Sequence, residues 1–306
     1  NTDNANINGS AWFDGTHVLN YSDLPYLLNG TLSNSGNVPI KVSYKITPRF
    51  TGCSDGTPVI TEVWVDPVVT ITASNDTICN GESTNILPKS NQTTYHGIRY
   101  TWTVTENSDI TGESGSSGNG NNLGVPIVQQ LTNNSNKAQK VTYTITPFAI
   151  NNSGNNACSF SKIYIDVWVE PTVIITAKND TICNKENMTI TPVTQSVVTS
   201  GIRYKWTVID NSGGDISGFS NSDMIGNSMG SSIVQTLKNS SSSVKNIVYR
   251  ITPWALNNDG ENTCSGTSID ITVYVNPTPR MSVTSNDTLF CNTNTALFTL
   301  LSKNGV

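Results

Sequence analysis

Six cysteines recur at matched places along this 306-residue chain, and they are the side chains whose spacing most plainly permits chemistry. Three end a short Asn-Asp-Thr motif, written NDTIC, NDTIC and NDTLFC: Cys79, Cys183 and Cys291. The other three each precede the last aliphatic run of a repeating stretch: Cys53, Cys158 and Cys264. Two thiols at matched places in every stretch would favour disulfides if the chain is exported, while no CxxC or Cys/His spacing suggests zinc. Six reduced, buried thiols are the alternative.

The cysteines are embedded in a repeat of about 104–106 residues. GIRYTWTV at 97–104 matches GIRYKWTV at 201–208, and KVSYKITP, KVTYTITP and NIVYRITP form a second series. This period exceeds the 20–50 residues of solenoid repeats, so each unit should be a domain with its own core. We expect whole units over residues 68–171 and 172–277, the back part of a unit over 1–67 and the front part of another over 278–306. Both ends look cut from something longer.

Within a unit, apolar residues alternate with polar ones, as in half-buried strands. In SIDITVYVNP (268–277) the aliphatic residues fall on one face, and Gly, Asn and Ser clusters separate such runs. Six or seven short strands in about 100 residues predict an all-β fold: tandem immunoglobulin-like sandwiches in an elongated array. The expected core aromatics are Trp102, Trp206, Tyr44, Tyr143 and Tyr249. Residues 1–40 match the other units poorly, and Trp12 does not have the spacing of Trp102 and Trp206.

The topology of such a sandwich constrains the cysteine pairing but leaves two arrangements open. The first and last of seven antiparallel strands run in the same direction, so the turn after the first and the loop before the last lie at opposite ends, roughly 30 Å apart. A disulfide needs Cα atoms under about 7 Å apart. Pairing within a unit (Cys79–Cys158, Cys183–Cys264) therefore requires a kinked first strand. Pairing between neighbouring units (Cys79–Cys264) joins the far end of one sandwich to the near end of the next. The geometry slightly favours this second arrangement.

The overall composition argues against several classes of partner. The chain has a net charge of −5 and only 13% charged residues, whereas nucleic-acid binding needs concentrated Lys and Arg. No run of 18 apolar residues is present, so we expect no membrane-spanning segment. The first ten residues lack the basic and apolar regions of a signal peptide. We also expect no cofactor.

These motifs resemble the PKD-like immunoglobulin domains of very large surface proteins in the Bacteroidetes. The residues that carry the resemblance are the Y-x-I-T-P strand, CSGT…ITVYVNPTP (264–279) and NDTICNGE (75–82). Such arrays are similar to those of gliding-motility adhesins of the SprB type. The resemblance implies export by the type IX pathway, display at the cell surface and an extended stalk or filament. It covers nearly the whole chain and is weaker for the particular protein than for the domain type.

The same resemblance implies a second role for the Asn-Asp-Thr motif. Asp-Thr-aliphatic triplets fit the pattern that Bacteroidetes glycosylation machinery modifies, which would place O-glycans on Thr77, Thr181 and Thr288. The alternative is a turn in which each Asp caps local backbone N–H groups.

The histidines form no recognisable catalytic pattern. His17 and His96 lie at non-equivalent places, and HExxH and P-loop motifs are missing from the sequence. Glu106, Asp109 and Glu113 could hold calcium, but the next repeat does not keep their spacing. We therefore expect no enzyme and no catalytic or metal-binding residues.

Three functions compete on these grounds. The leading hypothesis is a structural stalk of a large extracellular adhesin, which holds an adhesive region away from the cell and whose partners are the neighbouring repeats. The second is a carbohydrate-binding accessory module of a secreted hydrolase, which predicts an exposed aromatic row. The third is repeat-to-repeat contact with other copies in a filament. The sequence does not indicate the adhesive target.

Overall fold

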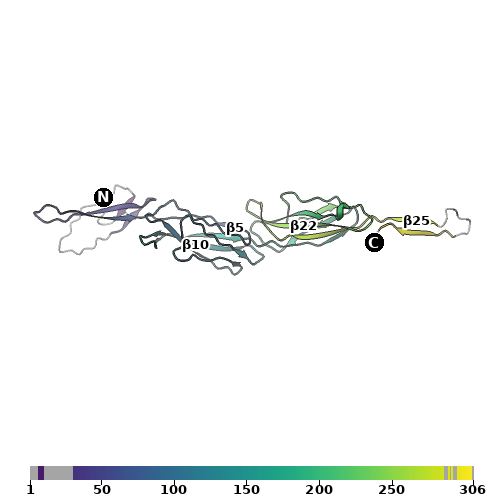
Figure 1. Ribbon diagram of the computed structural model, residues 1–306, viewed down its shortest axis with the longest axis horizontal. Coiled ribbons are helices and arrows are strands. Elements are labelled where there is room, and N and C mark those ends of the chain that lie inside the picture. The colour runs from purple at the N-terminus through teal and green to yellow at the C-terminus, as the bar shows by residue number, and fades with distance from the viewer. Residues whose placement is uncertain (1–5, 10–29, 286–288, 290, 292–294, 305–306) are drawn as a thin grey trace. The chain divides into compact units, whose positions relative to one another are not determined.

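The computed structural model describes residues 6–9, 30–285, 289, 291 and 295–304, and nearly all of its regular structure is β-strand (Figure 1). Among these residues the helical structure is a single 3-10 turn, η2 (Ser212–Gly214). The chain divides into two compact units. The first comprises Asn1–Asp76, Ser83–Leu131 and Lys140–Val167, and the second comprises Thr77–Glu82, Thr132–Gln139 and Trp168–Val306.

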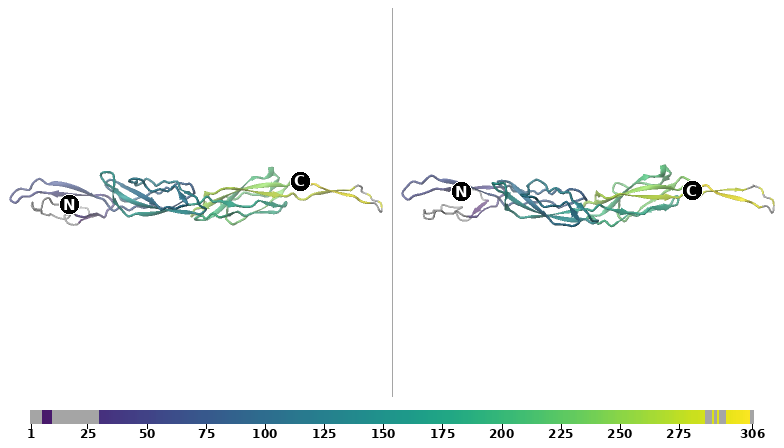
Figure 2. Two further views of the ribbon diagram at one scale, coloured as in Figure 1. Left: turned by 90° about the horizontal axis from the view of Figure 1, so that it is seen from below. Right: turned by 60° about the horizontal axis from the view of Figure 1, so that its bottom comes forward.

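The strands follow the repeats seen in the sequence (Figures 1 and 2). The N-terminal stretch contains β1 (Ile7–Gly9), β2 (Leu32–Asn34), β3 (Ile40–Ile46) and β4 (Val59–Val65). The first repeat contains β5 (Asp76–Ile78), β6 (Ile98–Val104), β7 (Ile110–Thr111), β8 (Asn121–Asn122), β9 (Thr132–Asn133), β10 (Gln139–Ile150), β11 (Asn156–Ser159) and β12 (Ile163–Val169).

The second repeat and the segment after it complete the chain. The second repeat contains β13 (Ile175–Thr176), β14 (Asp180–Ile182), β15 (Asn187–Ile190), β16 (Val193–Thr194), β17 (Ile202–Asp210), β18 (Ile216–Ser217), β19 (Asn227–Ser228), β20 (Ile233–Thr236), β21 (Lys238–Asn239), β22 (Lys245–Leu256), β23 (Asn262–Ser265) and β24 (Ile269–Val275). The following segment forms a hairpin of β25 (Met281–Ser285) and β26 (Phe298–Ser302).

Both repeats build their main sheet in the same strand order. In the first it runs β5-β12-β10-β6-β8 with β11 on β10, and in the second β14-β24-β22-β17-β19 with β23 on β22. The register also repeats, since Trp102 lies opposite Ile145 and Trp206 lies opposite Ile251. The all-β, tandem immunoglobulin-like fold expected from the alternating pattern is confirmed.

The last strands of the two whole repeats, β12 and β24, bury every second side chain over their last five residues, because successive residues of a strand point to opposite faces. In contrast, β4 is exposed over nearly its whole length. In β24 Ile271, Val273 and Val275 are buried, while Tyr274 between the last two is exposed. The opposite layer comes from shorter pairs such as β15 with β20, whose Met188 packs into the same core. Two layers of strands thus enclose one apolar core in the second unit.

Candidate functional site

A tight turn follows β5 and holds the first cysteine of the repeat; we call residues 79–82 the first cysteine turn. The Cys79 N–H donates to the Glu82 carboxylate at 3.0 Å, and the Glu82 N–H donates to the Cys79 carbonyl at 3.1 Å. Gly81 has a φ of 81°, in the left-handed region that suits glycine. These contacts fix the direction in which Cys79 leaves the turn.

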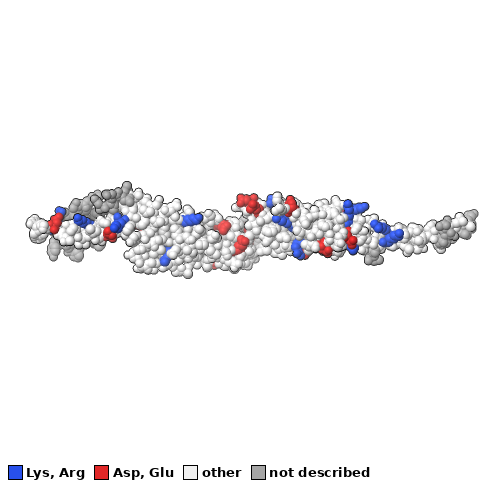
Figure 3. Space-filling view, turned by 45° about the horizontal axis from the view of Figure 1, so that its top comes forward, with Lys and Arg blue, Asp and Glu red and all other residues white. Residues whose placement is uncertain are grey.

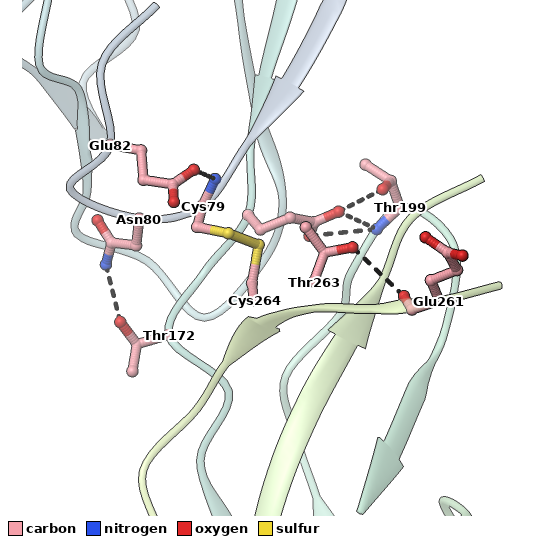
Figure 4. The surroundings of a disulfide bond; sticks show 9 residues. Cys79, Asn80, Glu82, Thr172, Thr199, Glu261, Thr263 and Cys264 are labelled. Atoms are coloured by element: carbon pink, nitrogen blue, oxygen red, sulfur yellow. Dashed lines mark hydrogen bonds between the residues drawn. A yellow bond between two sulfur atoms is a disulfide. The ribbon is translucent and has the colours of Figure 1, made fainter. Parts of the chain in front are cut away.

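Cys79 forms a disulfide with Cys264 on β23 (Figure 4). Their Cα atoms lie 5.4 Å apart and 185 residues apart in sequence. Of the two arrangements that the sequence left open, the structure therefore contains the one that joins residues of successive repeats. Thr77–Glu82 accordingly belongs to the second compact unit, although its sequence is part of the first repeat.

The second repeat shows why its own two cysteines do not meet. β14 pairs with β24 in parallel, with Ile182 opposite Val275, so Cys183 lies beside the end of β24. Cys264 precedes the start of the same strand. The seven residues of β24 separate the two by about 20 Å at 3.3 Å per residue. This is far beyond the reach of a disulfide.

Asn80 attaches the first cysteine turn to two further segments of the second unit, and Figure 4 shows its contact with one of them, at Thr172. Its side-chain oxygen accepts from the Asn133 N–H at 2.8 Å, and its amide donates to the Asn133 carbonyl and to the Thr172 hydroxyl, both at 3.0 Å. The disulfide is thus supported by hydrogen bonds on the same turn.

A buried asparagine recurs two residues after a leucine that stands at the matching place of each unit, Leu32, Leu131 or Leu237. These asparagines are Asn34, Asn133 and Asn239. In each case the side-chain amide donates to the carbonyl four residues ahead and to the carbonyl that ends the last strand. These side chains are at most 5% exposed. Sequence analysis missed them because Asn is frequent throughout the chain, although their constant offset from Leu32, Leu131 and Leu237 was a usable signal.

A second feature that sequence analysis missed is an acidic residue before two of the prolines that follow a last strand, Asp66 before Pro67 and Glu170 before Pro171; Asn276 precedes the third, Pro277. Glu170 is 1% exposed, and its carboxylate accepts from the Thr199 N–H at 3.0 Å and from the Thr199 hydroxyl. In the first unit Asp66 accepts from the Tyr95 N–H at 2.7 Å. Thr199 and Tyr95 each precede the glycine of a GIRY motif by two residues. The acidic residues therefore bind equivalent points of successive repeats.

The other four cysteines, Cys53, Cys158, Cys183 and Cys291, are exposed free thiols in the structure. Cys183 begins a second cysteine turn, residues 183–186, with the contacts of the first. Its N–H donates to the Glu186 carboxylate at 3.0 Å, and the Glu186 N–H donates to its carbonyl at 3.1 Å.

The expected core aromatics are buried to different extents. Tyr143 and Tyr249 are fully buried and Trp206 is 9% exposed, whereas Tyr44 and Trp102 are half-buried. The indole N–H groups of Trp102 and Trp206 donate to Ser114 and Ser220 carbonyls at 2.9 Å. Trp12 lies outside the described residues. Tyr100 and Tyr204, which were not among the expected core residues, are also fully buried.

Burial changes the ionisation of two of these tyrosines. The Tyr143 and Tyr249 hydroxyls donate to the Gln129 and Gln235 side chains at 2.7 Å. Desolvation raises the pKa of Tyr143 to about 12 and raises the pKa of Tyr249 further above its usual value, because the phenolate is disfavoured in an apolar interior.

The candidate glycosylation sites Thr77 and Thr181 are exposed, and Thr288 lies outside the described residues. Beside Thr181, the Asp180 carboxylate accepts from the Thr181 and Thr189 N–H groups at 2.8 and 3.3 Å. Asp180 thus caps local backbone groups while the threonine hydroxyl stays accessible.

Within the part of the chain that the structure describes, no group of three His, Cys, Asp or Glu side chains converges as a metal site would. Over the same residues, no helix has the length and apolarity needed to cross a bilayer. His96 stacks edge-on against Tyr95, and His17 falls outside the described residues.

The PKD-like domain model matches residues 76–172 and 180–279, which together cover more than half of the chain. The chain belongs to the PKD-like domain family. PKD-like and immunoglobulin-like domains are typically non-catalytic extracellular structural or adhesion modules. The disulfide accords with this class, because such bonds persist in oxidising surroundings.

Two of the solved structures that match the chain are from human and chicken. The human Desmocollin-1 ectodomain matches with 10% identity and a TM-score of 0.37, over 78% of this chain and 49% of that one. The chicken CNTN1 FN1-FN3 domains match with 10% identity and a TM-score of 0.30, over 76% of this chain and 75% of that one. The PKD-like chain thus spans about half the length of the desmocollin ectodomain. No curated protein matches its sequence.

Proposed function

We propose that the chain is a non-enzymatic part of the stalk of a large cell-surface adhesin, in which PKD-like repeats over 68–171 and 172–277 and partial repeats over 1–67 and 278–306 hold an adhesive region away from the cell. The observation that carries this proposal is the Cys79–Cys264 disulfide, which covalently joins residues of successive repeats. A covalent bond across a repeat boundary limits bending in a way that a flexible linker cannot.

The surface chemistry supports a spacer better than a ligand-binding module. Figure 3 shows Lys, Arg, Asp and Glu side chains scattered thinly among uncharged atoms. A surface of this kind stays hydrated through Asn, Ser and Thr, and it lacks the concentrated charge that steers charged ligands. We propose O-glycans on Thr77, Thr181 and Thr288 as an additional coat, and gliding motility with type IX export as the setting in which such a stalk acts.

Small-angle X-ray scattering of the purified chain tests the stalk. Each repeat should add roughly 35–45 Å to the maximum dimension, from strand length plus turns. The double variant Cys79→Ser, Cys264→Ser should keep the strands and show a broader distance distribution. A maximum dimension close to that of one compact domain of this mass would overturn the proposal.

A carbohydrate-binding module is the second candidate, because one aromatic pair is open to solvent. Trp64 and Tyr95 stack at 4.3 Å between ring centroids and are 40% and 48% exposed. Exposed aromatic faces can stack on sugar rings. Binding on a glycan array that is lost in Trp64→Ala and retained in Trp168→Ala would favour this candidate over the stalk.

A further inference from the structure

The second cysteine turn is built like the first but has no disulfide partner. Asn184 repeats two of the three contacts of Asn80: its side-chain oxygen accepts from the Asn239 N–H at 2.9 Å, and its amide donates to the Thr278 hydroxyl at 2.7 Å. The Cys183 thiol is exposed. The turn that orients Cys79 toward Cys264 is therefore reproduced around a cysteine that remains free.

The backbone of this second turn keeps its shape even where the residue type opposes it. Lys185 occupies the place of Gly81 and has a φ of 73°, against 81° for the glycine. A lysine is disfavoured in this left-handed region, and such conformations persist where the surroundings impose them. Here the Lys185 N–H donates to the Leu237 carbonyl at 2.8 Å, which ties the turn to the body of the unit.

Cys158 is the counterpart of Cys264 in the first repeat. It lies on β11, which pairs with β10 as β23 pairs with β22. Ser159 lies opposite Phe148, and the matching Ser265 lies opposite Trp254, so the two cysteines have the same place in the sheet. Cys264 is 8% exposed in its disulfide, whereas Cys158 is exposed.

We propose that the Cys79–Cys264 bond is one member of a series, in which the cysteine turn of every PKD-like repeat is disulfide-bonded to the β23-type strand of the repeat after it. Cys183 is then disulfide-bonded to the matching cysteine about 185 residues further along the chain. Cys158 is likewise bonded to the cysteine turn that lies about 185 residues before it. Cys53 and Cys291 follow the same rule. The inference rests on the proposed stalk, whose repeats it would join throughout.

Formation of each bond needs an oxidant, for which a small or protein-bound disulfide suffices. The Cys183 thiolate attacks one sulfur of that disulfide, forming a mixed disulfide and releasing the first thiolate. The partner cysteine, as thiolate, then attacks the Cys183 sulfur and releases the second. Two thiols are oxidised to one disulfide, and the oxidant leaves with the two electrons and two protons as two thiols.

A peptide map of the native full-length protein, isolated with free thiols blocked by alkylation, tests the series. Cleavage before Asp and after Lys or Arg places Cys183 on residues 180–185 and Cys158 on residues 141–162. Each peptide should be found joined to a cysteine peptide of another repeat and carry no alkyl group. Alkylated Cys183, a Cys158–Cys183 bond, or a bond to a second copy seen as a reducible doubling of mass would overturn the inference. A stalk shown by scattering could survive that result, so the two failures are distinguishable.

A lengthened chain supplies a matched control. Residues 278–306 are replaced by a second copy of residues 172–277, marked in the copy by Thr181→Ser and Ser265→Thr, so that the Cys183 and Cys264 peptides of the two copies differ in mass. The first Cys183 should then resist alkylation and join the marked peptide. With Cys264→Ser in the copy, this same Cys183 should become fully alkylated while Cys79 stays bonded. A Cys183 that is equally reactive in both chains would contradict the series.

Discussion

The side-chain amide of Asn239 donates to the main-chain carbonyl of Val275 at 2.8 Å, at the point where the last strand of the repeat ends. The same amide donates to the Ser243 carbonyl at 2.8 Å, and its oxygen accepts from the Ser241 N–H at 2.9 Å. One 4% exposed side chain thus closes a loop and fixes the end of a strand.

Asn239→Ala should therefore destabilise the second unit. It removes the side-chain donor from the buried Val275 carbonyl and the acceptor from the Ser241 N–H, which costs about 2–4 kcal/mol in the free energy of unfolding, whereas the Ser243 carbonyl keeps the Ser241 hydroxyl as a donor. Urea unfolding followed by fluorescence measures the loss. The exposed Asn258→Ala is the control and should change the stability by less than about 0.5 kcal/mol. Equal effects of the two substitutions would contradict this account of Asn239.

Loss of the disulfide should destabilise the second unit selectively. Cys264→Ser removes a cross-link between positions 185 residues apart and should cost about 2–4 kcal/mol. Cys183→Ser is the matched control, since that thiol is free in this chain. A reductant should lower the stability of the parent and of Cys183→Ser and leave Cys264→Ser unchanged. A reductant effect that persists in Cys264→Ser would show that a different bond matters.

Lys185→Gly should stabilise the protein. Glycine relieves the left-handed strain of about 1–2 kcal/mol but adds unfolded-state entropy, so we expect a net gain of about 0.5–1 kcal/mol. Gly81→Lys, the reverse change in the first cysteine turn, should destabilise by a similar amount. Thermal unfolding of both variants beside the parent checks the sign, and a loss of stability in Lys185→Gly would contradict the shared geometry of the turns.

Stability should fall in alkaline solution because of the buried tyrosines. Their pKa values are raised in the folded state, so their contribution is complete below the unfolded pKa of about 10 and is lost as pH rises toward 12 and above. Unfolding free energies measured across that window should decline less steeply in Tyr249→Phe than in the parent. Tyr274→Phe, at an exposed position, should leave the slope unchanged. A parent whose stability is flat over this window would contradict the assignment.

Much of the fold could be predicted from the sequence because it depends on a local pattern. The alternation of Ile271, Val273 and Val275 with exposed residues is visible in any window of six residues. The strand count predicted that the first and last strands run in the same direction. β14 and β24 do pair in parallel, with Ile182 opposite Val275. The periodic hydrophobic signal and the connection rules were sufficient for these features.

The contacts of the first cysteine turn could be predicted less well, because they depend on which compact unit a short segment of the chain packs with. Nothing in NDTICNGE indicates that Thr77–Glu82 packs with the second unit. Asn133 and Glu170 are polar residues whose burial becomes visible only when their partners are placed. Their recurrence at fixed offsets was the available signal. Asn is so frequent in this chain that a recurrent asparagine is hard to distinguish from the others.

The most direct test of the account is a non-reducing peptide map of the 306-residue chain, folded under oxidising conditions and then alkylated. Cleavage before Asp and after Lys or Arg separates all six cysteines, with Cys79 on residues 76–89 and Cys264 on residues 259–269. The account predicts that these two peptides are joined and that the other four carry the alkyl group. Joined pairs of Cys79 with Cys158 and of Cys183 with Cys264 would place the bonds within repeats and contradict the central claim.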